Sequence, residues 1–198
     1  MLRLQLARVD SLFLSPLCRR CPQGRAGCCA APPAVAWTDI GRIMRHGGRD
    51  FLLAEMREGR LSPSPRGLAI RRVPASADFP VRCTYLGPGD RGCILEPERR
   101  SATCNYYLCE DAFVLAENEG DSNMRSIRQA HDRIAELLGV CDLELSASVD
   151  ERFPNGPRWD EAFLDWLANE FDAVMRRYGK EWKKLGPGAQ GRISVQRK

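Results

Sequence analysis

Four thiols lie within twelve residues near the N-terminus of the 198-residue chain, in the segment CRRCPQGRAGCC. Cys18 and Cys21 form a C-x-x-C pair, and Cys28 and Cys29 are adjacent. A C-x-x-C turn is a common chelating unit of zinc ribbons and iron–sulfur proteins, because both sulfurs can reach one ion. Adjacent cysteine side chains generally diverge. We therefore expect the second pair to serve two metals, or one metal and a structural contact.

A second group of four cysteines follows further along the chain. Two short β-prone runs flank a Gly-Pro-Gly-Asp turn in VRCTYLGPGDRGCILE, which predicts a β-hairpin with Cys83 and Cys93 near its two strands. Cys104 and Cys109 come next, on a segment that we expect to be irregular or helical. Two tetrahedral sites of four thiolates would use all eight cysteines, and only Cys141 stands apart.

The surroundings of these cysteines favour metal ligation over disulfide bonds or packing. Thiols stay reduced in the cytoplasm, where we expect this chain because it has neither an evident secretory signal nor an apolar run long enough to cross a bilayer. Their neighbours are mostly Arg, Pro and Gly, whereas packing cysteines lie among apolar residues. Zinc and iron–sulfur clusters accept thiolate ligands equally well, so the expected metal is zinc or iron, including an iron–sulfur cluster. The candidate ligands are Cys18, Cys21, Cys28, Cys29, Cys83, Cys93, Cys104 and Cys109.

The charge distribution divides the chain at the same place as the cysteines. Residues 1–109 carry 17 basic and 9 acidic side chains, a balance of +8, and residues 110–198 carry 13 and 17, a balance of −4, which together give the net charge of +4. The basic residues of the first part are all arginine, and several flank cysteines. Nearby guanidinium groups lower thiol pKa values and offset the charge of thiolates. A solvated basic face or a nucleic-acid surface are the alternatives.

These observations predict an α+β fold: a small cysteine-rich, metal-stabilised domain with short helices and a β-hairpin, followed by a C-terminal helical portion. The predicted boundaries are 1–17 for an N-terminal extension, 18–115 for the cysteine-cluster domain, 116–185 for the helical portion packed on it, and 186–198 for a flexible tail.

Local signals predict two short helices in the first part. The first begins with Thr38 as N-cap and ends at Gly47-Gly48, and the second spans RDFLLAEMREG and is closed by Gly59. Residues 60–80 contain four prolines, which predicts a loop with at most a brief strand over residues 68–73.

Apolar periodicity predicts two longer helices in the second part. One starts near Met124 and stops at Gly139, and the other starts near Trp159. Along the latter, apolar and largely aromatic residues repeat at helical spacing as far as Leu185, which indicates a face docked on the core.

With these residues laid out, residues 18–109 resemble the YkgJ-type cysteine-cluster family of zinc- or iron-chelating domains. The matches are the N-terminal group ending in CC, the helix start TDIGRI, CTYL at Cys83, CILE at Cys93 and RSATCNYYLC around Cys104. The chain departs from the family in the wide spacing between Cys21 and Cys28, and in Ser101, Asn105 and Cys109. The resemblance implies metal binding and no defined reaction.

Three functional hypotheses follow. The first is a metal-binding protein, with a metal ion as its ligand and a protein partner for the C-terminal helices. The second is an iron–sulfur or iron-dependent oxidoreductase with one open metal position. The third, a zinc-supported nucleic-acid module using the arginines, ranks last. We expect His46 and His131 to be a helix cap and a packed side chain, and the carboxylates near Glu117 and Asp142 to be solvated.

Overall fold

The computed structural model describes residues 2–20, 27–74, 81–87, 92–120 and 124–185. Within these ranges the chain is α+β, with helices predominating and three two-stranded antiparallel pairs. The elements are β1 (Arg3–Gln5), β2 (Leu12–Leu14), the 3-10 helix η1 (Pro16–Arg20), α1 (Trp37–Arg45), α2 (Arg49–Arg57), β3 (Leu61–Ser64), β4 (Gly67–Ile70), β5 (Arg72–Val73), β6 (Arg82–Cys83), the 3-10 helix η4 (Pro97–Arg99), α3 (Ala102–Tyr106), α4 (Glu110–Asn118), α5 (Met124–Arg152), α6 (Glu161–Arg177) and α7 (Gly179–Lys184).

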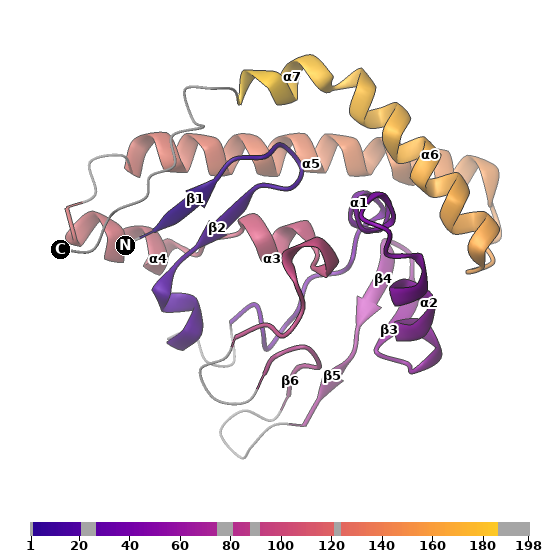
Figure 1. The fold of residues 1–198 in the computed structure, drawn as a ribbon, viewed down its shortest axis with the longest axis horizontal. Helices are drawn as coiled ribbons and strands as arrows, with labels where there is room; N and C mark the ends of the chain where they lie inside the picture. Colours follow the sequence, from indigo (N-terminus) through magenta and orange to yellow (C-terminus); the bar gives the residue numbers. More distant parts are fainter. Residues whose placement is uncertain (1, 21–26, 75–80, 88–91, 121–123, 186–198) are drawn as a thin grey trace.

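Helices α1, α5, α6 and α7, here called the helical layer, form one side of the molecule. Helix α5 runs along its length, α6 crosses it, and α1 packs against both (Figure 1). The β1–β2 hairpin lies alongside α5, and the short strands β5 and β6 lie at the opposite edge from α6 (Figure 1). Most buried apolar side chains, from Leu2 before β1 to Trp182 in α7, belong to a single hydrophobic cluster.

The closest helix contact in this core is between α1 and α6. Gly41 lies against the buried ring of Phe171, and a Cβ atom at position 41 would lie 2.4 Å from the Phe171 Cβ. A larger residue would therefore push the two helices apart. The aromatic stripe of the C-terminal part does dock on the core as predicted, with Phe163, Phe171 and Trp182 all buried.

The start of α1 differs from the predicted one. Ala36, not Thr38, is the N-cap. Asp39 accepts a hydrogen bond from the Ala36 amide at 2.8 Å, and the Asp142 side chain on α5 accepts one from the Thr38 amide at 3.0 Å. Two carboxylates thus satisfy the free amides of the first turn, one of them from a remote helix.

Two boundaries of the predicted C-terminal helices were wrong. Helix α5 does not stop at Gly139 but continues to Arg152. Cys141, Leu145 and Val149 extend its buried face at a spacing of four residues, and this packing outweighs the cost of about 1 kcal/mol for glycine within a helix. The helix predicted to start near Trp159 is interrupted at Tyr178, which separates α6 from α7.

The proline-rich stretch after α2 is more ordered than predicted. Strands β3 and β4 form a hairpin in which Leu61 is paired with Ile70 and Ser64 with Gly67. Gly67 adopts φ +111° there, and a Cβ atom at that position would collide with the Val35 carbonyl oxygen at 2.3 Å. The turn thus requires glycine, and it places β4 beside Val35, whose amide and carbonyl both bond to Leu68.

The predicted hairpin around Cys83 and Cys93 forms in part. Leu86 is bridged to Cys93, and the Ile94 amide bonds to the Tyr85 carbonyl, but Cys83, in β6, is paired with Arg72 of β5. Its Gly-Pro-Gly-Asp turn lies mostly outside the described residues, as does the predicted tail. None of the described helices has the length and apolar character that crossing a membrane requires.

Candidate metal centre

Cys28, Cys29 and Cys83 are brought together by the backbone. The first two lie in a turn that precedes α1, where the Ala30 and Ala31 amides bond to the Gly27 carbonyl. The Cys83 amide donates a hydrogen bond to the Cys29 carbonyl at 2.6 Å. This bond joins segments that are more than fifty residues apart in sequence. It places the CC pair beside β6.

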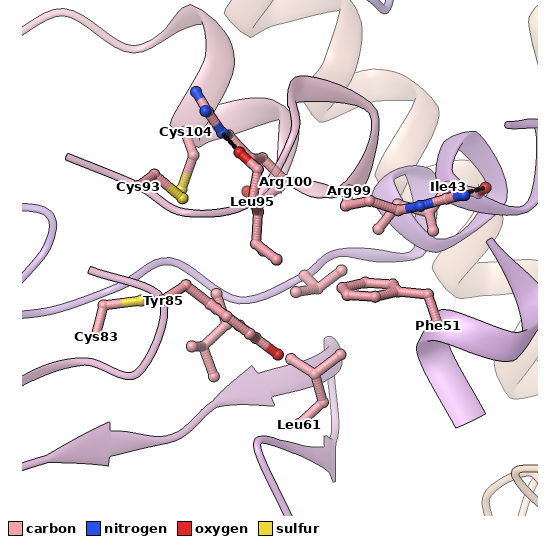
Figure 2. A pocket seen from close by; sticks show the side chains of 13 residues that line it. Ile43, Phe51, Leu61, Cys83, Tyr85, Cys93, Leu95, Arg99, Arg100 and Cys104 are labelled. Atoms are coloured by element: carbon pink, nitrogen blue, oxygen red, sulfur yellow. Dashed lines mark hydrogen bonds between the residues drawn. The ribbon is translucent and has the colours of Figure 1, made fainter. Parts of the chain in front are cut away.

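Cys83, Cys93 and Cys104 line one end of a small cavity of about 20 Å³ (Figure 2). Cys93 and Cys104 point toward each other from the loop after β6 and from α3, and Cys83 lies across the cavity from them (Figure 2). The rest of the lining is mainly apolar and includes Tyr85 and Phe51. We call the five cysteines of these segments the thiol cluster: Cys28, Cys29, Cys83, Cys93 and Cys104.

The pKa values of these thiols show that they interact electrostatically. The Cys29 thiol donates a hydrogen bond to the Cys28 sulfur, which lowers the pKa of Cys28 to about 6 and raises that of Cys29. Burial, and then the charge on Cys93, raise the pKa of Cys83. Cys104 is exposed on one side. Burial of the Cys104 thiol among other protein atoms still raises its pKa. The charges on Cys93, Asp39, Cys28 and Cys83 raise it further. A nearby cation would therefore favour deprotonation of Cys29, Cys83 and Cys104.

The described arginines do not provide that compensation in the way the sequence suggested, and Arg25 and Arg91 lie outside the described residues. None of the described arginines is among the leading causes of the shifted pKa values of Cys28, Cys29, Cys83 or Cys104. Arg99 and Arg100 instead donate to backbone carbonyls, of Ile43 and Leu95 respectively.

Cys104 is positioned by two buried charged residues of α1. Asp39 accepts a hydrogen bond from the Ala102 amide at 2.6 Å, at the start of α3, and its other carboxylate oxygen bonds to Ala36. Arg42 is 1% exposed and donates to the carbonyls of Pro97, at 3.3 Å, and of Arg100. The segment leading into Cys104 is thus fixed to α1 at three backbone groups. We call Asp39 and Arg42 the α1 clamp.

The α1 clamp was not predicted from the sequence, where we gave Asp39 and Arg42 no role. The sequence did contain a signal for it, because a charged pair three residues apart lies within the TDIGRI motif, on a helix whose neighbouring residues are apolar. Asp39 is 2% exposed, and burial raises its pKa to about 6 although both amides oppose the shift.

The remaining candidate ligands lie on other elements or outside the described residues. Cys18 is exposed in η1, and Cys21 lies outside the described residues. Cys109 is the N-cap residue of α4, beyond the end of α3, and is partly buried against the core. Cys141, which was not a candidate, is fully buried in α5.

The two histidines lie in other surroundings. His46 is the C-cap residue of α1, and its Nε2 lies 2.9 Å from the Asp10 carboxylate. His131 packs between aromatic rings, with ring centroids 5.4 Å from Phe113 and 5.8 Å from Tyr106. Asp142 was expected to be solvated. It is half-buried instead, and it bonds to the start of α1.

In the ranges that the structure describes, no three His, Cys, Asp or Glu side chains are arranged to hold one metal ion. Cys21, one half of the C-x-x-C pair, lies outside those ranges. No protein-family model, no curated protein and no solved structure matches the chain. The resemblance to the YkgJ-type family therefore stays a prediction.

Proposed function

We propose that the protein binds zinc or iron, the latter including an iron–sulfur cluster, through cysteines of the thiol cluster. The observation that carries this proposal is that three separate segments, which together carry five cysteines, are attached to one another by backbone hydrogen bonds. Cys28 and Cys29 reach Cys83 through the bond from the Cys83 amide to the Cys29 carbonyl. Cys93 reaches the same strand through the bond from the Ile94 amide to the Tyr85 carbonyl at 2.9 Å.

The chemistry of the donor set suits such a metal. All five candidate donors are sulfur atoms. Zinc and iron bind sulfur ligands, whereas magnesium and calcium bind oxygen ligands. Burial and the charges of neighbouring cysteines raise the pKa values of Cys83 and Cys104, and a bound cation would oppose that effect by favouring the thiolates. The bound ion would supply charge that neutralises the thiolates, and Cys83, Cys93 and Cys104 would hold it together with the CC pair.

The direct experiment is elemental analysis for zinc and iron, with an optical spectrum, on protein purified under reducing conditions. We expect about one zinc or iron ion per chain, or about two to four irons per chain for an iron–sulfur cluster. A colourless zinc protein and a coloured iron protein would be told apart by the spectrum. Less than about half an equivalent of either metal would contradict the proposal.

Paired substitutions would locate the metal. Cys83→Ser combined with Cys104→Ser should abolish binding, because it removes one donor from each side of the cavity. Cys141→Ala is the matched control, since this buried thiol lies in α5 and is not a candidate ligand. A doubly substituted chain that keeps the parental metal content would place the metal outside the thiol cluster.

A further inference from the structure

A groove lies beside the loop that joins α5 to α6, at one end of the helical layer (Figure 1). Its volume is about 440 Å³, within the range of roughly 300–1,000 Å³ that is usual for ligand sites. The end of α5 with the loop after it, the turn of the β3–β4 hairpin and the indole rings of Trp37 and Trp159 form its lining. The thiol cluster contributes no residue to this lining, so a ligand of the groove would be separate from the proposed metal.

The aromatic rings of the groove are held in place by other rings. Trp37 is buried and stacks on the half-buried Trp159, with ring centroids 5.7 Å apart and an angle of 13° between the ring planes. Phe163 packs edge-on against Trp159 at 5.2 Å and against Phe153 at 5.3 Å. Because these rings are already fixed, little side-chain freedom is lost when a ligand packs on them. The prolines of the lining are Pro63, Pro65, Pro154 and Pro157.

The uncharged polar groups of the groove suit an extended peptide. A polyproline II helix has no internal hydrogen bonds, so its carbonyl oxygens are free to accept hydrogen bonds from a partner. Ser64 and Asn155 line the groove, and neither side chain forms a hydrogen bond to another described residue. The Ser64 hydroxyl and the Asn155 amide can therefore donate to such carbonyls.

The charge of the groove favours a cation. Asp150 is exposed, is the one charged residue of the described lining, and forms no ion pair within the described part of the chain. It lies in the last turn of α5, where the free carbonyl groups of a helix end also attract positive charge. Arg152 of the same turn packs over the rings of Phe153 and Trp166 and is not part of the lining. A basic side chain that enters the groove would thus meet an unpaired carboxylate.

We propose that this groove binds a proline-rich peptide of a partner protein, in the polyproline II conformation, with a basic residue of the peptide at Asp150. The proline rings pack on Trp159, which is backed by Trp37. Ser64 and Asn155 donate to carbonyl oxygens of the peptide backbone. Proline fixes φ before binding, so the peptide loses little conformational freedom, and aromatic-lined grooves recognise such peptides for this reason.

The test is fluorescence anisotropy with the full chain and fluorescein-labelled peptides, at about 0.15 M salt so that distant charges are screened. The probe is a peptide of six prolines with a C-terminal arginine. One control replaces the prolines with alternating glycine and serine, and the other replaces the arginine with glutamate. We expect the probe to bind at least about tenfold more tightly than the glycine–serine peptide, and about fivefold more tightly than the glutamate peptide. A glycine–serine peptide that binds as tightly as the probe would overturn the proposal.

Charge variants test the role of Asp150. Asp150→Lys should reverse the preference, so that the glutamate peptide binds more tightly than the arginine peptide. Glu151→Lys is the matched control, because it makes the same charge change at the next residue, which is exposed and outside the lining, and it should keep the parental preference. The same shift in both variants would refute the assignment to Asp150.

Two further measurements test the rest of the site. Trp159→Ala should weaken binding of the probe at least about tenfold, and circular dichroism would show that the helices of the variant are intact. Unchanged binding in this variant would contradict a site on Trp159. Analytical ultracentrifugation of the parent and of Asp150→Lys tests a second copy of the chain as the occupant. Self-association that Asp150→Lys abolishes would assign the groove to that copy and overturn the proposal.

Discussion

The helical layer and the thiol region, defined as residues 27–35, 81–87 and 92–106, are stabilised in different ways. In the helical layer, long helices share one apolar core, and Phe171, Leu167 and Leu145 have no exposed surface. In the thiol region, by contrast, β6 has only two residues and α3 only five. Its segments meet through a few backbone hydrogen bonds and through polar side chains that reach in from α1 and α2.

This difference separates folding from metal binding. Among the helices of the helical layer, only α5 carries a cysteine, Cys141, and the cysteines of the thiol cluster lie on other segments. Loss of a metal would therefore leave the packing of the helical layer unchanged, while the thiol region would lose the cation that permits its thiolates to lie close together. We expect the two regions to respond to different substitutions.

The largest effect is expected for Phe171→Ala in the helical layer. The change would leave a cavity between α6 and α1, beside Gly41, and should cost about 3–5 kcal/mol in the free energy of unfolding, measured by urea denaturation with circular dichroism. Below its unfolding transition, the variant should bind as much metal per chain as the parent. Phe51→Ala is the comparison, because this half-buried ring lines the cavity near the cysteines. If Phe171→Ala lost as much bound metal as Phe51→Ala, this result would contradict the separation of the two regions.

The next largest effect is expected for Asp39→Asn in the α1 clamp. Asparagine has one acceptor oxygen where aspartate has two, so either Ala36 or Ala102 loses its bond, at a cost of about 2 kcal/mol. Because α3 carries Cys104, metal affinity should also fall, by about tenfold as for other groups that orient metal ligands. Asp142→Asn is the matched control. It weakens the start of α1 through Thr38, but it does not contact α3, so affinity should stay the same. Equal affinities in the two variants would show that Asp39 has only a structural role.

The same carboxylate gives the protein a pH dependence of defined sign. Burial raises the pKa of Asp39 from 3.8 to about 6, so the folded state holds this proton more tightly than the unfolded state. The stability that comes from this tighter proton binding is present in full below pH 4, and it is lost as the pH rises through about 6. The stability difference between parent and Asp39→Asn, measured without metal, should therefore shift against the parent between pH 4 and pH 6. A difference that is constant over this range would contradict the raised pKa.

The sequence was most informative where neighbouring residues decide the structure. Helices α1 and α2 end at predicted glycines, because Gly47 and Gly59 adopt positive φ values that other residues avoid. Position 139 is also a glycine, but it lies within α5, where the packing of residues on either side keeps the helix continuous. Local signals could not distinguish these cases.

The unpredicted contacts join residues that are far apart in the chain. Asp39 and Ala102 are 63 residues apart, and Thr38 and Asp142 are 104 apart. Both aspartates appear in sequence as ordinary polar residues near a helix start or on a helix surface. Only the fold reveals that each bonds to the end of another helix. The clustering of cysteines was visible from spacing, but the mutual position of Cys29 and Cys83 was not, because it depends on one backbone hydrogen bond.

The smallest effect is expected for Tyr85→Phe in the thiol region. The Tyr85 hydroxyl donates to Glu55 of α2 at 2.6 Å, and Glu55 keeps its two bonds from Arg60, at 2.5 and 2.7 Å, when that donor is removed. We expect a loss of about 1 kcal/mol, confined to the thiol region.

Hydrogen exchange can test whether that loss is local. The Ile94 amide bonds to the Tyr85 carbonyl, so its exchange in Tyr85→Phe should accelerate about fivefold, as 1 kcal/mol implies when local opening controls exchange. The Phe171 amide in α6 should exchange as in the parent, because the helical layer does not depend on this contact. Tyr107→Phe is the control, since Tyr107 is exposed. Equal acceleration at Ile94 and Phe171 would mean that the two regions open together, and that a metal bound at the cysteines also stabilises the helices.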